Sequence, residues 1–133
     1  MPSSIQEAPM KTWTRDELSK FGAADEIEIA TLGRDGRPRK AVAIWIVRLG
    51  DDFYIRSAYG RGSAWFRGVQ RLHEGRIRAG GIQKDVSFLD PDLRLNDEID
   101  AAYRTKYRRH GAQYVNMMVS PEARSASLKL LAR

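Results

Sequence analysis

Alternating hydrophobic and polar positions in the first third of the chain predict antiparallel strands. Residues 26–32 alternate strictly, with Ile27 and Ile29 on one side, as is typical of a half-buried strand. The Asp-Gly pair within residues 33–36 favours a tight hairpin turn directly after it. We therefore expect a β-hairpin whose first arm buries these two isoleucines.

The most apolar run, residues 39–48, predicts a central strand that is covered on both faces. The small Ala41 and Ala43 leave room on one of these faces, either for tight packing or for a flat ring. A turn at 49–52 then predicts that residues 53–57 pair back as a third antiparallel strand. Three strands joined by short turns contain no parallel crossover, which argues against a Rossmann fold.

Three segments carry the signals of short helices. Thr14, with Glu17 three residues later, matches a capping box. Residues 64–72 have apolar side chains at helical spacing after Ser63, a good N-cap residue. A third helix is predicted to be capped by Asn96, with acids at its start and arginines at its end, as the helix dipole prefers.

Further strands are predicted at 76–82, 84–89 and 127–131, with 115–119 as a strand or an extended segment. Gly75 is expected to end the helix that precedes the first of them. The last strand would complete a barrel. The pattern as a whole therefore predicts a mainly β domain with short helices.

Length and composition are those of one globular domain, which we place at residues 13–133 after a loose arm at 1–12. No apolar run approaches the ~20 residues that a membrane span needs, and the N-terminus lacks the apolar core of a signal peptide. Cysteine is absent and only two histidines occur, which argues against disulfides and metal centres. No catalytic residue is predicted, and the expected location is the cytoplasm.

The net charge of +6 indicates an anionic partner, such as nucleic acid, a membrane surface or a phosphorylated small molecule. Basic residues are spread over 34–40, 56–78 and 104–109, with acids between them. Because the charge is not concentrated in one tail, a small anionic ligand is favoured over a long polyanion.

Residues 53–68 combine the parts of a phosphate site. The predicted strand ends in Arg56 and Ser57, a glycine-rich turn that contains Arg61 follows, and a helix starts at Ser63. Glycines let the backbone approach a ligand, and a helix N-terminus offers free N–H groups and a favourable dipole. The two arginines would add charge-assisted hydrogen bonds. The alternative is an ordinary N-capped helix with both arginines in water.

Four segments together resemble an uncharacterised bacterial family, domain of unknown function 2255: EIEIATLGRDGRPRKAVAIWIV, FYIRSAYGRGSAWFRGV, EIDAAYRTKY and ARSASLKLL. That family is similar to FMN-binding split-barrel proteins, which include pyridoxamine-phosphate oxidases and deazaflavin (F420)-dependent nitroreductases. The run Gly36-Arg37-Pro38-Arg39 resembles the opening of the second strand in the deazaflavin group. The resemblance implies a six-stranded antiparallel split β-barrel that usually pairs as a homodimer.

The same resemblance implies where a cofactor would bind. The cofactor phosphate would contact the end of the third strand and the next loop, at Arg56, Ser57, Arg61 and Ser63. The second-strand positions from Lys40 to Val42 would lie near the ring. Flavin oxidases often carry a Ser-Arg-Lys run in this loop, whereas this chain has Arg-Gly-Ser. FMN is the expected cofactor, with deazaflavin F420 as the alternative.

Three functions remain open from the sequence. The first is a flavin-type oxidoreductase, in which the cofactor carries the hydride chemistry and no acid–base pair is needed. The second is a barrel that binds a small ligand without turnover. The third, nucleic-acid binding, follows from the charge but is disfavoured, because the aromatic side chains fall on apolar faces and few remain for base stacking.

Overall fold

The computed structural model describes residues 12–133, so that the predicted arm at 1–12 lies almost wholly outside the described residues. In chain order the elements are α1 (Arg15–Ala23), β1 (Ile27–Thr31), β2 (Val42–Ile44), β3 (Val47–Leu49), β4 (Asp52–Arg56), η1 (Gly60–Gly62), α2 (Ala64–Leu72), β5 (Glu74–Ala79), β6 (Ile82–Leu89), η2 (Leu93–Leu95), α3 (Asn96–Lys106), η3 (Arg108–His110), α4 (Ala112–Met118), α5 (Pro121–Ser125) and β7 (Ser127–Ala132).

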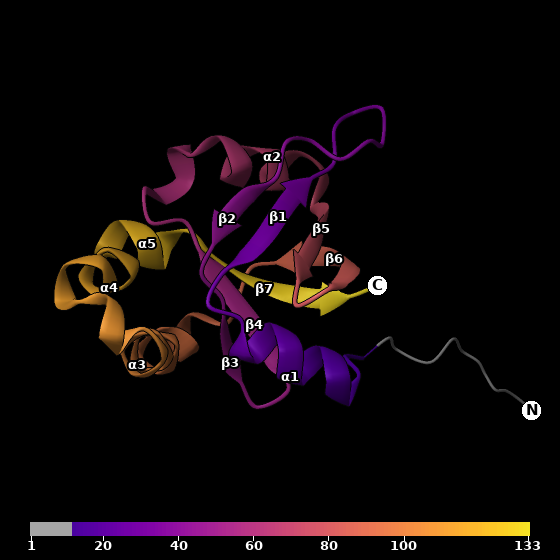
Figure 1. Cartoon of the computed structure of the whole chain (residues 1–133). Helices are drawn as coiled ribbons and strands as arrows, with labels where there is room; N and C mark the ends of the chain where they lie inside the picture. Colours follow the sequence, from indigo (N-terminus) through magenta and orange to yellow (C-terminus); the bar gives the residue numbers. More distant parts are fainter. Residues whose placement is uncertain (1–11) are drawn as a thin grey trace, which may run out of the picture.

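The strands form one antiparallel sheet in the order β2-β1-β5-β6-β7-β4-β3. Its first and last strands, β2 and β3, follow each other directly in the chain, so the sheet curls until its two ends meet at Trp45 and Ile46 (Figure 1). The predicted mainly β fold with short helices is confirmed. There are seven strands rather than six, because the predicted strand at 39–48 is divided in two.

The prediction that 39–48 is a central strand is wrong. Its two parts occupy opposite ends of the sheet, and β2 is largely exposed. The chain can break at Ile46 because side chains replace a neighbouring strand: the Tyr107 hydroxyl accepts from its N–H at 3.0 Å, and the Lys106 ammonium donates to its carbonyl at 2.7 Å. The apolar faces indicated coverage correctly only around the break, where Ile46 is fully buried and Trp45 stacks on Tyr107.

The first two helices form largely as predicted. In α1, the Thr14 hydroxyl accepts from the Glu17 N–H and the Glu17 carboxylate accepts from the Thr14 N–H, which confirms the capping box. Helix α2 ends at Leu72, where His73 adopts a left-handed conformation. The prediction that Gly75 ends this helix is wrong. It lies within β5, where a Cβ atom would come 2.7 Å from the Ala30 carbonyl oxygen.

The prediction of a strand or extended segment at 115–119 is also wrong, because α4 occupies it. Val115 and Met118, three residues apart, are buried beside Tyr103 and Tyr107 of the α3 region, so the packing favours a helix. Asn96 is the first residue of α3 rather than its cap. Helices α3, α4 and α5 lie together on one side of the sheet, whereas α2 covers its other end (Figure 1).

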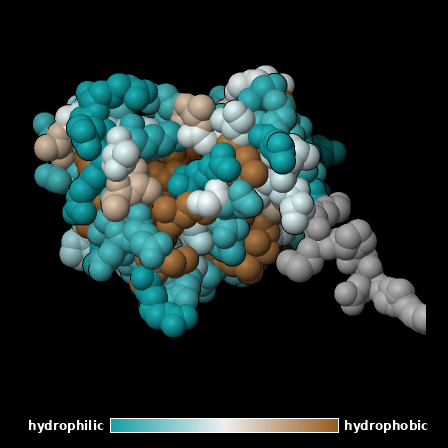
Figure 2. Space-filling model, turned by 90° about the horizontal axis from the view of Figure 1, so that it is seen from below, coloured by the Kyte–Doolittle hydropathy of each residue, from teal (hydrophilic) through white to brown (hydrophobic). Residues whose placement is uncertain are grey.

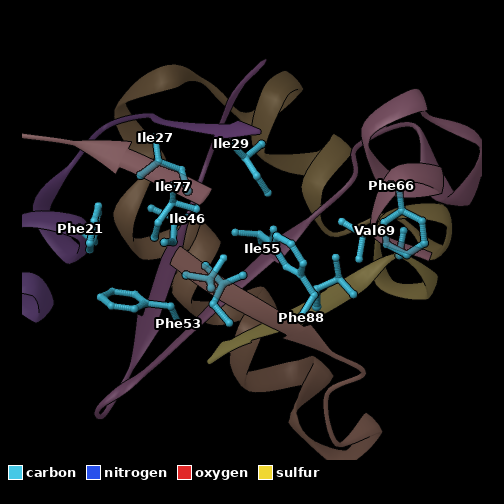
Figure 3. Close-up of a cluster of buried hydrophobic side chains, with 14 of the residues drawn as sticks. Phe21, Ile27, Ile29, Ile46, Phe53, Ile55, Phe66, Val69, Ile77 and Phe88 are labelled. Atoms are coloured by element: carbon cyan, nitrogen blue, oxygen red, sulfur yellow. The ribbon is translucent and has the colours of Figure 1, made fainter. Parts of the chain in front are cut away.

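Two hydrophobic clusters hold strand β4 from both sides. The main core fills the curled sheet, where residues such as Ile46, Ile55 and Phe88 point toward one another (Figure 3). The second cluster joins β3 and β4 to α3 and α4, and Tyr54 and Tyr103 belong to it. Each buried large apolar side chain contributes about 1.5–3 kcal/mol to the stability of the fold. Since both clusters contain such side chains, the end of β4 is held in place from both faces.

The face of the molecule in Figure 2 is mainly hydrophilic, with hydrophobic surface gathered near its middle. Among the helices of residues 12–133, none has the length and hydrophobicity needed to cross a membrane.

Candidate functional site

The end of β4 turns sharply into α2, as the sequence predicts. The Ser57 N–H donates to the Ala126 carbonyl at 3.1 Å, and the Gly60 N–H donates to the Ser57 carbonyl at 3.0 Å. Gly60 has a φ of 80°, a conformation that other residues rarely adopt, and it is buried against Glu122 of α5. The turn is therefore held by both its own backbone and α5.

Arg56, at the end of β4, is 1% exposed and its guanidinium makes five hydrogen bonds. Its Nε donates to Ser127 Oγ at 2.8 Å, and its Nη1 donates to the Asp100 carboxylate and to the Met118 carbonyl. Its Nη2 donates to the carbonyl and the side-chain oxygen of Asn96, each at 3.2 Å. These bonds match the five N–H donors that a guanidinium has.

This arrangement differs from the expectation that Arg56 binds a phosphate directly. Its charge is compensated by Asp100, which is itself 7% exposed and also forms an ion pair with Arg124. The guanidinium has no donor left for a ligand. Arg56 instead joins the end of β4 to α3, α4 and β7.

Ser57 and Ser63 are brought together as predicted, with their Oγ atoms 2.9 Å apart. Ser63 is the N-cap residue of α2, but its hydroxyl makes no capping hydrogen bond and instead faces Ser57. The first α2 residue whose N–H returns to the Ser63 carbonyl is Arg67. The N–H groups of the first turn are thus uncapped by this side chain, beside two hydroxyl groups.

Arg61 is separated from this serine pair. Its guanidinium donates to the Ser125 carbonyl at 2.7 Å and to Gln70 at 3.3 Å, and it lies 5.2 Å from the centre of the Phe66 ring. It lines another hollow of about 280 Å³, which Arg124 also lines. The structure therefore does not bring Arg61 and Ser57 to one cavity.

A cavity of about 300 Å³ opens beside Ser57. Its walls come from β2, the end of β4, the start of α2 and α4. They are mostly aromatic or apolar and comprise Glu26, Ala43, Ile44, Trp45, Arg56, Ser57, Ala58, Tyr59, Trp65, Tyr114, Met117 and Met118. A cavity of this size and lining suits part of a flat aromatic ligand. We take this cavity as the candidate site.

Val42 is the first residue of β2 and Lys40 precedes that strand, and neither residue lines this cavity. Val42 pairs with Ile29 across β1 and β2, so both side chains point to the same face of the sheet. Lys40 precedes Val42 by two residues and lies outside any regular strand. Both residues are exposed, and the neighbouring Ala43 and Ile44 form the cavity wall instead.

Unpaired basic side chains gather on the β1–β2 connection and on α2. This basic surface consists of Arg34, Arg37, Arg39, Lys40, Arg67 and Arg71, none of which has a side-chain hydrogen bond or ion pair to another of residues 12–133. Asp35 is the one acid within 34–40, so these six cations leave five positive charges there, most of the net +6. Arg34, Arg39 and Arg71 line a hollow of about 240 Å³.

The wall of the candidate site near Trp45 is fastened by the end of α3. Tyr107 stacks on Trp45 with ring centres 4.0 Å apart. Burial lowers the pKa of the neighbouring Lys106 to about 8. The hydrogen bond from His110 lowers the pKa of Asp25, which also pairs with Arg109. These contacts join α3 to both the α1–β1 loop and the β2–β3 break.

Some residues of the site were not found from the sequence. Tyr114 and Met117 were hidden by the extended assignment of their segment, although the spacing of Val115 and Met118 was a helical signal. For Glu26, the alternation of residues 26–32 predicts only the start of a strand. No group of His, Cys, Asp and Glu among residues 12–133 is arranged to hold a metal ion.

Comparison with protein families gave a match over most of the chain. A family model described as "Uncharacterized protein conserved in bacteria (DUF2255)" matches residues 17–130. A search of curated proteins gave no match.

Solved structures with similar folds differ widely in sequence. A NimC/NimA family protein from Clostridium acetobutylicum has a TM-score of 0.56 and 12% identity, covering 89% of this chain and 79% of that one. A FAD-binding protein from Mesorhizobium loti has a TM-score of 0.54 and 15% identity, covering 95% and 94%. An F420 reductase has a TM-score of 0.54 and 14% identity, covering 87% and 90%. The likeness shows the fold, which is the antiparallel split barrel that the family resemblance implies.

Proposed function

We propose that this chain, which belongs to the DUF2255 family of bacterial proteins, binds a phosphorylated flavin-type cofactor in the candidate site. The observation that carries the proposal is the pair of hydroxyl groups of Ser57 and Ser63, 2.9 Å apart beside the uncapped start of α2 and next to an aromatic cavity. Proteins of the same fold that are described as FAD-binding or as an F420 reductase support this choice of ligand.

In this proposal the phosphate is bound by neutral donors. The Ser57 and Ser63 hydroxyls and the first N–H groups of α2 would donate to its oxygens, and the helix dipole favours negative charge there. Arg56 would act indirectly, by fixing Ser57 through its bonds to α3, α4 and β7. Arg61 would contribute only from the neighbouring hollow.

The ring would lie against the exposed β2 wall. Ala43 has a small side chain there, and the free side of Trp45 completes the wall. At about 300 Å³ the cavity is at the lower end of the range for ligand pockets, ~300–1,000 Å³, so we propose that a second copy of the chain covers β2 and completes the site as a homodimer. Val42 and Lys40 would then lie beside the ring, as predicted.

The proposed activity is that of an oxidoreductase. When bound, the cofactor would supply the hydride chemistry. The chain would bind the phosphate through its serines, orient the ring against Trp45 and exclude water with the apolar side chains of α4. Because the cofactor would carry the hydride chemistry, the protein needs no acid–base pair. A cofactor ring that binds but is not reduced would instead indicate a binding protein without turnover.

FMN and deazaflavin F420 both fit this proposal. The basic surface favours F420, because that cofactor carries an acidic tail and these arginines have no acidic partner among the described residues. FMN needs only the phosphate contacts of the serine pair. FMN binding would therefore depend on the serine pair, whereas F420 binding would also depend on the basic surface.

Titration of the protein with FMN, F420 and riboflavin tests the proposal. The double variant Ser57→Ala and Ser63→Ala should weaken FMN binding by about 10- to 100-fold, because hydrogen bonds to charged groups contribute about 1.5–3 kcal/mol. Riboflavin, which lacks the phosphate, should change little. Ser125→Ala, whose hydroxyl donates to the Glu122 carbonyl away from the cavity, is the matched control.

Two results would contradict the proposal. One is the absence of binding of FMN and F420 at about tens of micromolar, a concentration that a resident cofactor site should saturate. The other is an equal loss for FMN and riboflavin in the double serine variant, which would place the phosphate elsewhere.

A further inference from the structure

Glu26, between α1 and β1, lies where two hollows meet. It lines the 300 Å³ candidate site and also a wide, open hollow of about 950 Å³ that continues along α1 and the β5–β6 turn. Ala43 of β2 is likewise shared by both. A ligand that fills the candidate site would therefore reach Glu26 at its outer side.

The Glu26 carboxylate makes no hydrogen bond or ion pair with any other described residue, so its charge is not compensated by them. Every other charged side chain along the two hollows has a partner. These pairs are Lys20 with Asp16, Asp25 with Arg109 and His110, Glu28 with Arg78, and Arg56 with Asp100. Among the described residues, both hollows thus carry one uncompensated charge, and it is negative although the chain has a net charge of +6.

Aromatic rings surround the cavity beside this carboxylate. Trp45, Tyr59, Trp65 and Tyr114 all line it. One face of Trp45 is covered by the parallel ring of Tyr107, so its other face is the one available to the cavity. Tyr59 and Tyr114 are 79% and 54% exposed, which places them at the opening. Aromatic faces attract cations, and a nearby carboxylate strengthens this preference.

We infer that the outer side of the candidate site binds the positively charged nitrogen of an alkylamine or quaternary ammonium compound. The cation would lie among the aromatic rings and against the Glu26 carboxylate, while Ser57 lines a different part of the wall. This cation site requires only the cavity and its charges and no bound cofactor. If the chain is an oxidoreductase, this site defines an amine-bearing substrate class.

Calorimetric titration of the full chain without added cofactor tests the inference. The probes are benzyltrimethylammonium, the neutral benzyl alcohol and the anionic benzoate. The ammonium probe should bind most tightly, and Glu26→Gln should weaken it by about five- to tenfold. Glu28→Gln is the matched control, because Glu28 lines the wider hollow but not the candidate site, and its carboxylate is paired with Arg78; it should leave the affinity unchanged.

Tyr114→Leu, at the exposed opening, should also weaken the ammonium probe while circular dichroism shows the fold to be retained. The inference is overturned if the wild-type protein does not bind the ammonium at about 10 mM, if the three probes bind equally, or if Glu26→Gln has no effect. Failure of FMN and F420 to bind would remove the proposed function and leave this result intact.

Discussion

Arginine occurs in two opposite settings in this molecule. Arg56 is 1% exposed and uses all five of its donors on the protein itself, within a network that spans four elements. On the basic surface, Arg39 and Arg71 are exposed and have no side-chain partner among the described residues. The first arginine is part of the structure, whereas the others are available to a ligand.

The difference shows that a basic residue in a motif is not the same as an available charge. Burying a charge is costly unless it is paired, so a guanidinium inside the fold has already been neutralised by its surroundings. A ligand that needs a positive charge must therefore find it on the basic surface, and one that enters the candidate site must rely on hydroxyl and N–H groups.

The largest effect on stability is expected for the buried arginine, Arg56. Arg56→Met should lower the free energy of unfolding by about 3–5 kcal/mol, because it removes the buried partner of the Asp100 carboxylate and leaves it only the more exposed Arg124. Urea denaturation measures this loss. Adding Asp100→Asn should recover part of it, since the uncompensated charge is then removed.

The matched control for that experiment is Arg61→Met, whose guanidinium is exposed and should contribute less than about 1 kcal/mol. If Arg56→Met kept its stability and lost only ligand affinity, Arg56 would be a ligand contact and the contrast would be wrong.

A smaller and opposite effect on stability is expected at Tyr103. This residue is fully buried, and the centre of its ring lies 5.6 Å from the Arg56 guanidinium carbon. Its hydroxyl has no hydrogen-bond partner among the described residues, and burial raises its pKa strongly. Tyr103→Phe should therefore raise the free energy of unfolding by about 1 kcal/mol. Thermal and urea unfolding would measure it.

Tyr107→Phe provides the comparison for Tyr103, because its hydroxyl is bonded to Ile46 and Asp25. That variant should be destabilised by about 1–3 kcal/mol. Equal losses in both variants would mean that the Tyr103 hydroxyl has a partner after all.

The smallest effect on stability is expected for the exposed arginines of the basic surface. The triple variant Arg34→Gln, Arg39→Gln and Arg71→Gln should change the free energy of unfolding by no more than about 0.5 kcal/mol. It should nevertheless elute from a heparin column at distinctly lower salt, because these charges are free to contact a polyanion.

A second triple variant removes the same formal charge from paired sites: Arg76→Gln, Arg94→Gln and Arg109→Gln, whose partners are Asp85, Asp92 and Asp25. It should shift elution less. Equal shifts would show that only the total charge matters. A gel shift with single-stranded nucleic acid that is lost only in the first triple variant would revive the nucleic-acid alternative.

Local patterns predicted local structure well. The capping box of α1, the alternation of β1 and the helical spacing of α2 all involve residues close in sequence, and all were confirmed. The double-sided apolar run at 39–48 failed because two different elements cover it: the sheet interior holds Ile46, and α3 holds Trp45. A one-dimensional pattern records that both faces are covered, but it does not record where in the sheet order the strand lies.

The candidate site follows the same rule. Ser57 and Ser63 are six residues apart, and their approach was predictable from the turn between them. The partners of Arg56 lie 40 to 71 residues further along the chain, so its commitment to the interior could not be seen locally. Glu26 acquires its isolated charge only because its neighbours in space are paired, which is again a property of the folded molecule.

The divided strand has a consequence for cooperativity. Ile46 obtains its hydrogen bonds from Tyr107 and Lys106, and Arg56 obtains its own from α3, α4 and β7, so that the C-terminal third of the chain supplies bonds that the N-terminal half cannot make for itself. The β2–β3 break, where the two ends of the sheet meet, and the helices beside it should consequently unfold together in one step. In native-state amide exchange, the protected N–H groups of β4 and α3 would then report one common opening free energy.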